Sequence, residues 1–162
     1  MGAQTRNPSG IAYNAAIPVH VKSLASMAAG ADLGTDADPS VMLICTKPTR
    51  VHGGRLIARG TPTGIDGSNT LVVKLRAISA AGAVLGTICS HTMTTNPAAV
   101  GKLPPSVDLN GTNNLDPAYW DIPAGGGIGL VITQGATADL HATAIVDVVL
   151  CLSTADDSSL SN

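Results

Sequence analysis

The sequence predicts an all-β fold, an antiparallel β-sandwich of jelly-roll or Greek-key type with an extended N-terminal arm. The 18 Gly and 10 Pro are spread between short apolar runs, a distribution typical of turns that connect strands. Every acidic residue is Asp and none is Glu, which favours turns over helices. Hydrophobic residues make up 44% of the chain although Phe is absent, so the core is expected to consist of Val, Ile, Leu and Ala. A chain of 162 residues fits one domain.

Residues 1–16 are small and polar and predict an extended arm that needs a surface to lie on. The candidate contact residues in this arm are Thr5, Arg6, Asn7 and Tyr13. The first residues contain no apolar segment, so we expect neither a signal peptide nor a membrane span.

The first half of the domain is expected to hold three strands. Residues 17–24 alternate apolar and polar side chains, which predicts a strand with one wet face, and 25–40 read as a loop with room for one helical turn near 24–29. The continuous apolar run 41–46 favours a central strand that ends at 47–50, and a further strand is expected at 55–59.

The second half begins with the clearest hairpin, formed by residues 70–79 and 83–92 around Ala80-Ala81-Gly82. Residues 94–114 are rich in turn formers and are expected to cross between the sheets. We expect a short strand or bend at 119–122 and a strand at 127–134.

The last strand, residues 141–152, has two different faces. One face is wholly apolar and should line the core; its members are Ala142, Ala144, Val146, Val148, Leu150 and Leu152. The other mixes Ile145 and Val149 with polar residues. We therefore expect Ile145 and Val149 to be covered by a neighbouring subunit or by the arm. The domain is bounded at 17–152, and 153–162 form a polar tail.

The histidines, cysteines and carboxylates form no recognisable catalytic or metal-binding pattern. The four histidines make no HxH or HExxH pair, and the HxH and Glu of metal-binding cupins are missing. No GxSxG elbow occurs, and Cys89 and His91 on one strand would lie about 7 Å apart, beyond hydrogen-bond reach. The glycines at 125–129 lack the Lys-Ser or Lys-Thr of a phosphate loop. We expect a protein that is not an enzyme and has no metal or cofactor.

The charge and the cysteine content of the chain indicate which kinds of partner it has and where its thiols lie. Only 12% of residues are charged and the net charge is −2. Soluble surfaces carry about 25–35% charged residues, so we expect partners to cover part of this surface. The absence of a basic run argues against nucleic-acid binding. Cys45, Cys89 and Cys151 lie in apolar runs and are interpreted as small buried hydrophobic residues.

Tyr119 and Trp120 are the one aromatic pair and leave two interpretations open. On an exposed loop they would stack on a sugar ring. In a chain without Phe, a lone Trp would instead fill one end of the core or an interface. Both residues are candidate interface residues.

The segment YWDIPAGGGIGLVITQG, followed by a small-residue loop and ATAIVDVVL, resembles the C-terminal half of small jelly-roll virion proteins of tailed bacteriophages. These include capsid decoration (cement) proteins and head-fibre bases. The resemblance covers about a third of the chain. Six positions match the pattern of the group: Asp121, Ile122, Ala124, Gly125, Leu130 and Gly135. Gly126 stands where the group often has Asp.

The resemblance implies a homotrimeric structural protein, made in the host cytoplasm, that binds the outer capsid surface. There it would clamp neighbouring major capsid subunits. The arm 1–16 and the loops 25–39 and 94–114 are the candidate contact segments. The alternative is a receptor- or glycan-binding head of a fibre.

Overall fold

The computed structural model describes residues 5–6, 12–24, 28–97, 106–109, 118–139 and 146–155, and every regular element within them is a β-strand. The all-β prediction is therefore confirmed. None of the described residues belongs to a helix that could span a membrane.

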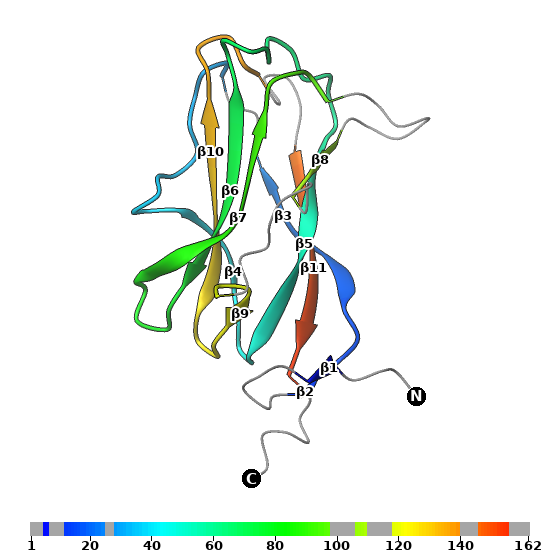
Figure 1. Cartoon of the computed structure of the whole chain (residues 1–162), viewed down its shortest axis with the longest axis vertical. Helices are drawn as coiled ribbons and strands as arrows, with labels where there is room; N and C mark the ends of the chain where they lie inside the picture. Colours follow the sequence, from blue (N-terminus) through cyan, green and yellow to red (C-terminus); the bar gives the residue numbers. More distant parts are fainter. Residues whose placement is uncertain are drawn as a thin grey trace.

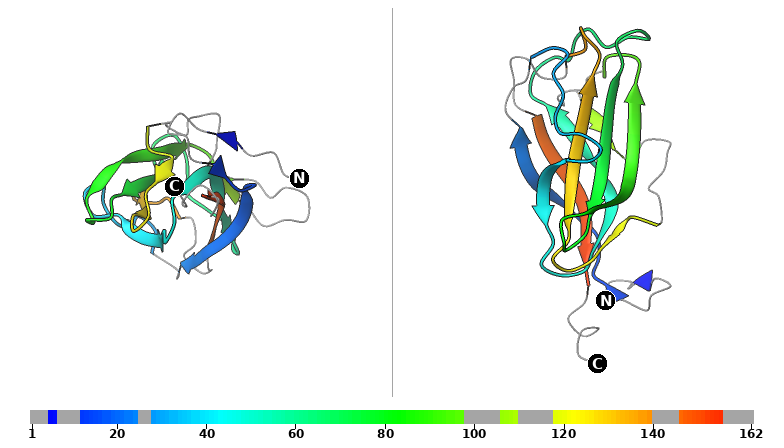
Figure 2. Two further views of the ribbon diagram at one scale, coloured as in Figure 1. Left: turned by 90° about the horizontal axis from the view of Figure 1, so that it is seen from below. Right: turned by 90° about the vertical axis from the view of Figure 1, so that its left-hand side faces the viewer.

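Two antiparallel sheets pack face to face (Figures 1 and 2). The first has the order β4 (Ser40–Ile44), β10 (Gly127–Gln134), β6 (Leu71–Ile78) and β7 (Val84–Met93). The second has the order β3 (Ile17–Leu24), β11 (Val146–Thr154), β5 (Thr49–Ala58) and β8 (Ser106–Asp108), and β9 (Asp121–Ile122) also pairs with β5. A small ribbon pairs β1 (Thr5–Arg6) with β2 (Ala12–Tyr13).

The strand order is that of a jelly roll. Four antiparallel pairs are nested in the sequence: β3 with β11, β4 with β10, β5 with β8, and β6 with β7. A long ribbon of such nested pairs, wrapped around a core, brings β11 beside β5 and β10 beside β6, as observed. The predicted sandwich and its jelly-roll order are confirmed.

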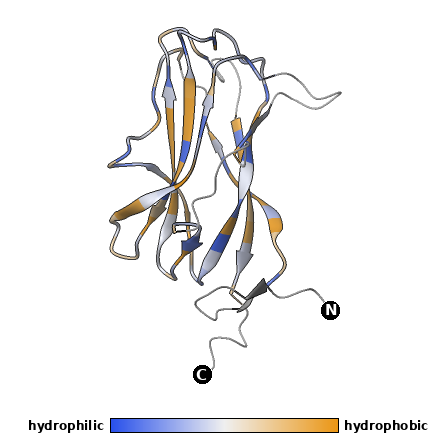
Figure 3. Cartoon of the chain, viewed as in Figure 1, coloured by the Kyte–Doolittle hydropathy of each residue, from blue (hydrophilic) through white to orange (hydrophobic). Residues whose placement is uncertain are grey.

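The core lies between the sheets and is aliphatic, as the composition predicts. Val146, Val148 and Leu150 of β11 are fully buried and Leu152 nearly so, which confirms the apolar face of the last strand where it is described. Residues 141–145 lie outside the described residues. The hydropathy colouring shows apolar positions along β10 and β6 (Figure 3).

Strand β5 is longer than predicted. The sequence suggested a break between residues 50 and 55, but Thr49–Ala58 form one strand. Gly53-Gly54 does not form a turn: Gly53 pairs with Cys151 beside a β-bulge whose extra residue is His52, and Gly54 pairs with Leu150. Gly53 has a φ of 120°. A Cβ on Gly54 would lie 2.4 Å from the carbonyl oxygen of Val149.

A second difference concerns residues 94–114. The predicted crossing between the sheets is confirmed, because β7 and β8 belong to different sheets, but the segment also contains a strand that was not predicted. Residues 106–108 form β8 and continue the ladder of β5, because the amide of Leu109 donates to the carbonyl of Gly54 at 2.8 Å. The amide of Val51 donates to the carbonyl of Trp120 at 2.9 Å, just before β9. β8 and β9 therefore pair with different segments of the same edge of β5, residues 55–57 and 49–50, opposite the edge that pairs with β11.

The third difference concerns the apolar run 41–46, which favoured a central strand. It forms β4, which lies at an edge of its sheet and pairs only with β10 within the described part of the chain. This placement leaves apolar side chains exposed, as described below.

Candidate interaction surface

The exposed large apolar side chains are concentrated on two edge strands. Ile17 of β3 and Ile44 of β4 are each 59% exposed, Val41 of β4 is 47% exposed, and Leu85 of β7 is 46% exposed. Strands β3 and β4 end their respective sheets on the same side of the sandwich (Figure 2). We call Ile17, Val41 and Ile44, together with the hollows that they border, the β3/β4 edge.

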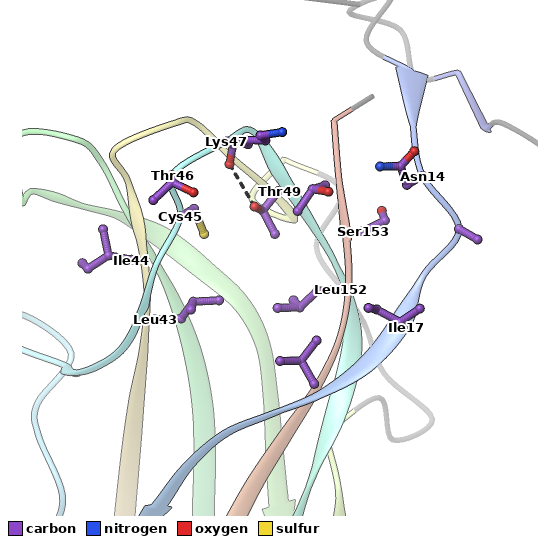
Figure 4. Close-up of a pocket in the computed structure, with 13 residues that line it drawn as sticks. Asn14, Ile17, Leu43, Ile44, Cys45, Thr46, Lys47, Thr49, Leu152 and Ser153 are labelled. Carbon is purple, nitrogen blue, oxygen red and sulfur yellow. Dashed lines mark hydrogen bonds between the residues drawn. The ribbon is translucent and has the colours of Figure 1, made fainter. Parts of the chain in front are cut away.

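The larger hollow lies between the two edge strands and has a volume of about 550 Å³. Its wall includes Ile17 and Val19 of β3, and Leu43 and Ile44 of β4. Leu43 points into the hollow toward Leu152, whereas Ile44 points away from it (Figure 4). The upper rim in that view is polar and is supplied by residues at or next to the strand ends: Asn14, Thr46, Lys47, Thr49 and Ser153.

A smaller hollow of about 220 Å³ lies on the other side of β4, and Pro39, Val41, Ile44, Ile78 and Val84 contribute to its wall. It is on the outer face of the sheet. Alternate residues of β10 are fully buried in the core, so the intervening glycines face outward.

Those glycines allow the preceding loop and β4 to approach β10 closely. A Cβ on Gly129 would lie 2.7 Å from the Cβ of Pro39, and one on Gly127 would lie 2.9 Å from the carbonyl oxygen of Leu43. The glycine pattern that superficially suggested a phosphate loop thus has a packing role at this edge.

At the end of β4, the hydrogen bonds of Cys45 determine which way the backbone groups of Ile44 point. The amide of Cys45 donates to Gly126 at 2.8 Å, and the carbonyl of Cys45 accepts from Gly125 at 2.7 Å. Successive residues of a strand direct their backbone groups to opposite sides. The N–H and C=O of Ile44 therefore point away from β10, toward the side on which the described residues supply no further strand.

Next to the larger hollow, Arg50 is held between two aromatic rings. Its guanidinium carbon lies 4.8 Å from the ring centroid of Tyr13 and 5.2 Å from that of Trp120. Nε and one terminal nitrogen donate to the two carboxylate oxygens of Asp121 at 2.8 and 2.9 Å. This bidentate pair with two ring faces is the arrangement for which Arg is preferred over Lys.

Tyr13 attaches the end of the arm to this cluster. It is 1% exposed and forms a β-bridge with Ala155, and the next amide, that of Asn14, donates to Thr154 at 2.9 Å. Burial, followed by the charge of Asp121, raises the pKa of Tyr13 to about 12. The phenol therefore stays protonated at neutral pH.

His52 and Ser153 extend the cluster along β5 and β11. Nε2 of His52 lies 2.8 Å from Oγ of Ser153. Burial, followed by the positive charge of Arg50, lowers the pKa of His52. The uncharged imidazole is thus the form that this site favours.

A second polar cluster on the outer face of β3 and β11 resembles a Ser-His-Asp triad only in composition. Nε2 of His20 lies 3.3 Å from both Oδ1 of Asp147 and Oγ of Ser23, and Ser23 donates to the same carboxylate oxygen at 2.7 Å. In a hydrolytic triad the Asp and the Ser contact different ring nitrogens. Arg59 donates to both oxygens of Asp147, at 2.8 and 3.1 Å, and lowers its pKa. The cluster acts as an ion-pair network between strands.

The predicted interface residues fall into three groups. Thr5 and Arg6 form β1, but the structure describes only their backbone. Asn7 and Ile145 lie outside the described residues. The other four are described and lie at different places: Tyr13, Tyr119, Trp120 and Val149.

Of these four, Tyr119 and Trp120 are neighbours in the sequence, and Trp120 also lies near Tyr13. Tyr13 and Trp120 both contact Arg50. The ring of Tyr119 occupies the space that a side chain at Gly86 would need. Val149 is half-buried and borders a shallow hollow of about 210 Å³ beside Pro18 and Asp108.

The three cysteines are free thiols, and Asp32 and Asp36 of the loop before β4 have partners within the chain. Cys45 and Cys89 are buried and Cys151 is partly exposed. Burial raises the pKa of Cys89 to about 11. Asp36 pairs with Lys74 at 2.7 Å, and Asp32 accepts from the amide of Gln134. Within the described ranges, the side chains of His, Cys and Asp gather nowhere in a group that could hold a metal ion.

Comparison of the chain with protein-family models, with curated proteins and with solved structures finds no match in any of the three. The functional argument therefore depends on the geometry of this chain and on its sequence.

Sequence reasoning did not identify the β3/β4 edge. Its signal was present in Val41-Met42-Leu43-Ile44, an apolar run typical of a strand that is covered on both faces. The run did not show that β4 would be an edge strand, because strand order depends on the wrapping of the whole chain.

Proposed function

We propose that this chain is a structural virion protein that binds the outer capsid surface and holds neighbouring major capsid subunits together. The observation that carries the proposal is the β3/β4 edge. Exposed Ile17, Val41 and Ile44 adjoin two hollows along one side of a charge-poor jelly roll. Apolar surface of this kind, rimmed by polar residues, is typical of protein interaction sites.

The internal polar contacts support a scaffold role for the rest of the domain. Arg50, Arg59 and Lys74 each bind a carboxylate of the same chain. These pairs join neighbouring strands or a loop to a strand, and so stabilise the body that presents the edge. The resemblance of residues 119–135 to phage decoration proteins supplies the identity of the partner. A homotrimer on the capsid, assembled after synthesis in the host cytoplasm, belongs to the same proposal.

The alternative role, a receptor- or glycan-binding fibre head, depended on Tyr119 and Trp120 as a sugar platform. Trp120 stacks on Arg50, and Tyr119 packs against Gly86. Because both rings have contacts within the chain, the edge is the better supported binding surface.

The test uses particles of the encoding virus that were produced without this protein. Purified wild-type chain is added back, and the particles are separated by sedimentation and heated. We expect the protein to sediment with the particles and to raise the temperature at which they release DNA. Protein that remains in the supernatant at every concentration, with no change in particle stability, would refute the proposal.

A further inference from the structure

Strand β4 has the side chains of a central strand in the position of an edge strand. Its residues Val41 to Ile44 are all apolar, whereas edge strands are normally protected by charge, proline or a covering segment. Edge strand β3 is protected in this way, since it carries Pro18, His20 and Lys22. Of the two strands at the β3/β4 edge, β4 is therefore the one suited to accept another strand.

The backbone supports the same interpretation. The N–H and C=O of Ile44 point to the side of β4 on which no described strand lies, as the hydrogen bonds of Cys45 to Gly125 and Gly126 require. An added strand would find a donor and an acceptor there, next to a side chain that is 59% exposed.

The two hollows define what such a strand would carry. Side chains of a strand alternate between the two faces of its sheet. A strand placed beside β4 would direct one set of side chains into the 550 Å³ hollow lined by Leu43, and the next set toward the 220 Å³ hollow lined by Val41. Both walls are mainly apolar, so consecutive residues of the added strand should be apolar, and the larger side chains should face the larger hollow.

We propose that β4 is the acceptor for an extended, uncharged, apolar segment of a partner protein, which binds by strand addition to the edge Val41–Ile44. This inference rests on the proposed function only for the existence of a partner chain. It adds the mode of binding and the chemistry of the segment recognised.

The experiment selects short peptides from a random displayed library on the wild-type chain, after removal of peptides that bind the Ile44→Asp variant. We expect enriched peptides with runs of β-branched and aliphatic residues. Their affinity should fall by at least about tenfold in Ile44→Asp and in Val41→Asp, because a carboxylate would be buried at the contact. Leu85→Asp, a matched change of an exposed residue on edge strand β7, should bind as wild type.

Amide hydrogen exchange separates strand addition from side-chain docking. When a selected peptide binds, exchange of the Ile44 amide in the wild-type chain should slow by roughly tenfold or more. Unfolding midpoints of the variants show whether each one is folded. If Ile44→Asp is unstable, Val41→Asp replaces it in the selection.

With the purified chain, three results would overturn the inference: no peptide distinguishes wild type from the edge variants, the Ile44 amide exchanges unchanged in the complex, or the edge pairs with a second copy. If the wild-type chain self-associates and the edge variants do not, the strand that binds β4 comes from a second copy of the chain. Edge variants that still bind capsids would also refute strand addition at β4 while leaving the proposed function intact. Failure of the wild-type chain on capsids would refute that function instead.

Discussion

Arg50 is the residue that joins the arm, β5 and β9 at one end of the sandwich. It contacts Tyr13, Trp120 and Asp121 at once. A buried ion pair contributes less than its Coulomb energy suggests, but removal of one partner leaves the other charge poorly solvated. The cluster is therefore sensitive to truncation of either partner.

We predict that Arg50→Met lowers the free energy of unfolding by about 2–4 kcal/mol, somewhat less than for a fully buried pair, because the Asp121 side chain is 34% exposed. Urea denaturation measures the change. The matched control is Arg55→Met on the same strand, whose pair with Asp108 spans 3.9 Å between exposed side chains and should contribute at most about 1 kcal/mol. Equal losses in both variants would contradict the role assigned to Arg50.

His52 predicts a pH dependence of stability with a defined sign. Its pKa in the folded chain is lowered by burial and by Arg50, so the unfolded chain binds the proton more readily. The contribution of His52 to stability is then complete above the unfolded pKa of about 6.5 and decreases as the pH falls toward the folded pKa. His52→Gln should therefore lose less stability than wild type between about pH 7 and pH 5.5. Parallel slopes in urea denaturation across this range would show that His52 does not titrate in this way.

At the scale of elements, the glycines of β5 and β10 determine how closely strands pack. Gly54 faces the backbone of β11, where a Cβ would meet the carbonyl oxygen of Val149 at 2.4 Å and a side-chain atom of Leu150 at 2.8 Å. Neither neighbour can move without disturbing the central ladder of the second sheet.

Gly54→Ala should therefore reduce the free energy of unfolding by roughly 2–3 kcal/mol through overpacking. Gly67→Ala is the control, because the corresponding Cβ meets nothing within 4 Å and its φ is not positive. Its effect should stay within about 0.5 kcal/mol. Thermal unfolding of the two variants tests the claim, and a Gly54→Ala midpoint equal to that of Gly67→Ala would be inconsistent with the described packing.

Local patterns predicted most strands because the alternation and the turn residues that define a strand lie within or next to it in the sequence. The alternation in β11 and the turn at Ala80-Ala81-Gly82 each depend on neighbours in sequence, and both were predicted correctly. The continuity of β5 could not be predicted, since Gly53-Gly54 is as typical of a turn as of a bulge. Strand β8 was missed because its three residues stand among Pro, Asn and Gly.

At the scale of the whole molecule, the nested strand pairs explain why the sequence did not reveal the candidate surface. Pairing of β4 with β10, more than eighty residues later, leaves β4 at the edge. An apolar run such as 41–46 would be covered on both faces in a central strand. The wrapping of the chain instead places it beside two hollows, and the binding role assigned to it follows from that position.

Tyr13 and Trp120 also show that sequence patterns do not predict contacts between distant segments. Sequence composition identified both as interface candidates, but not that both rings would contact the one guanidinium of Arg50. The cluster joins residues from three segments that are distant in the sequence. No local pattern in the sequence therefore predicts it.

The central proposal is that the partner chain binds, in the assembled particle, along the edge of β4 on which no described strand lies. Hydrogen–deuterium exchange of the chain, compared free in solution and bound to capsids, tests it most directly. The account predicts that the amides of β4 (Ser40–Ile44), and above all that of Ile44, become protected on the particle, while β7 exchanges as it does in the free chain. Unchanged exchange along β4 in protein that is fully bound to capsids would contradict it.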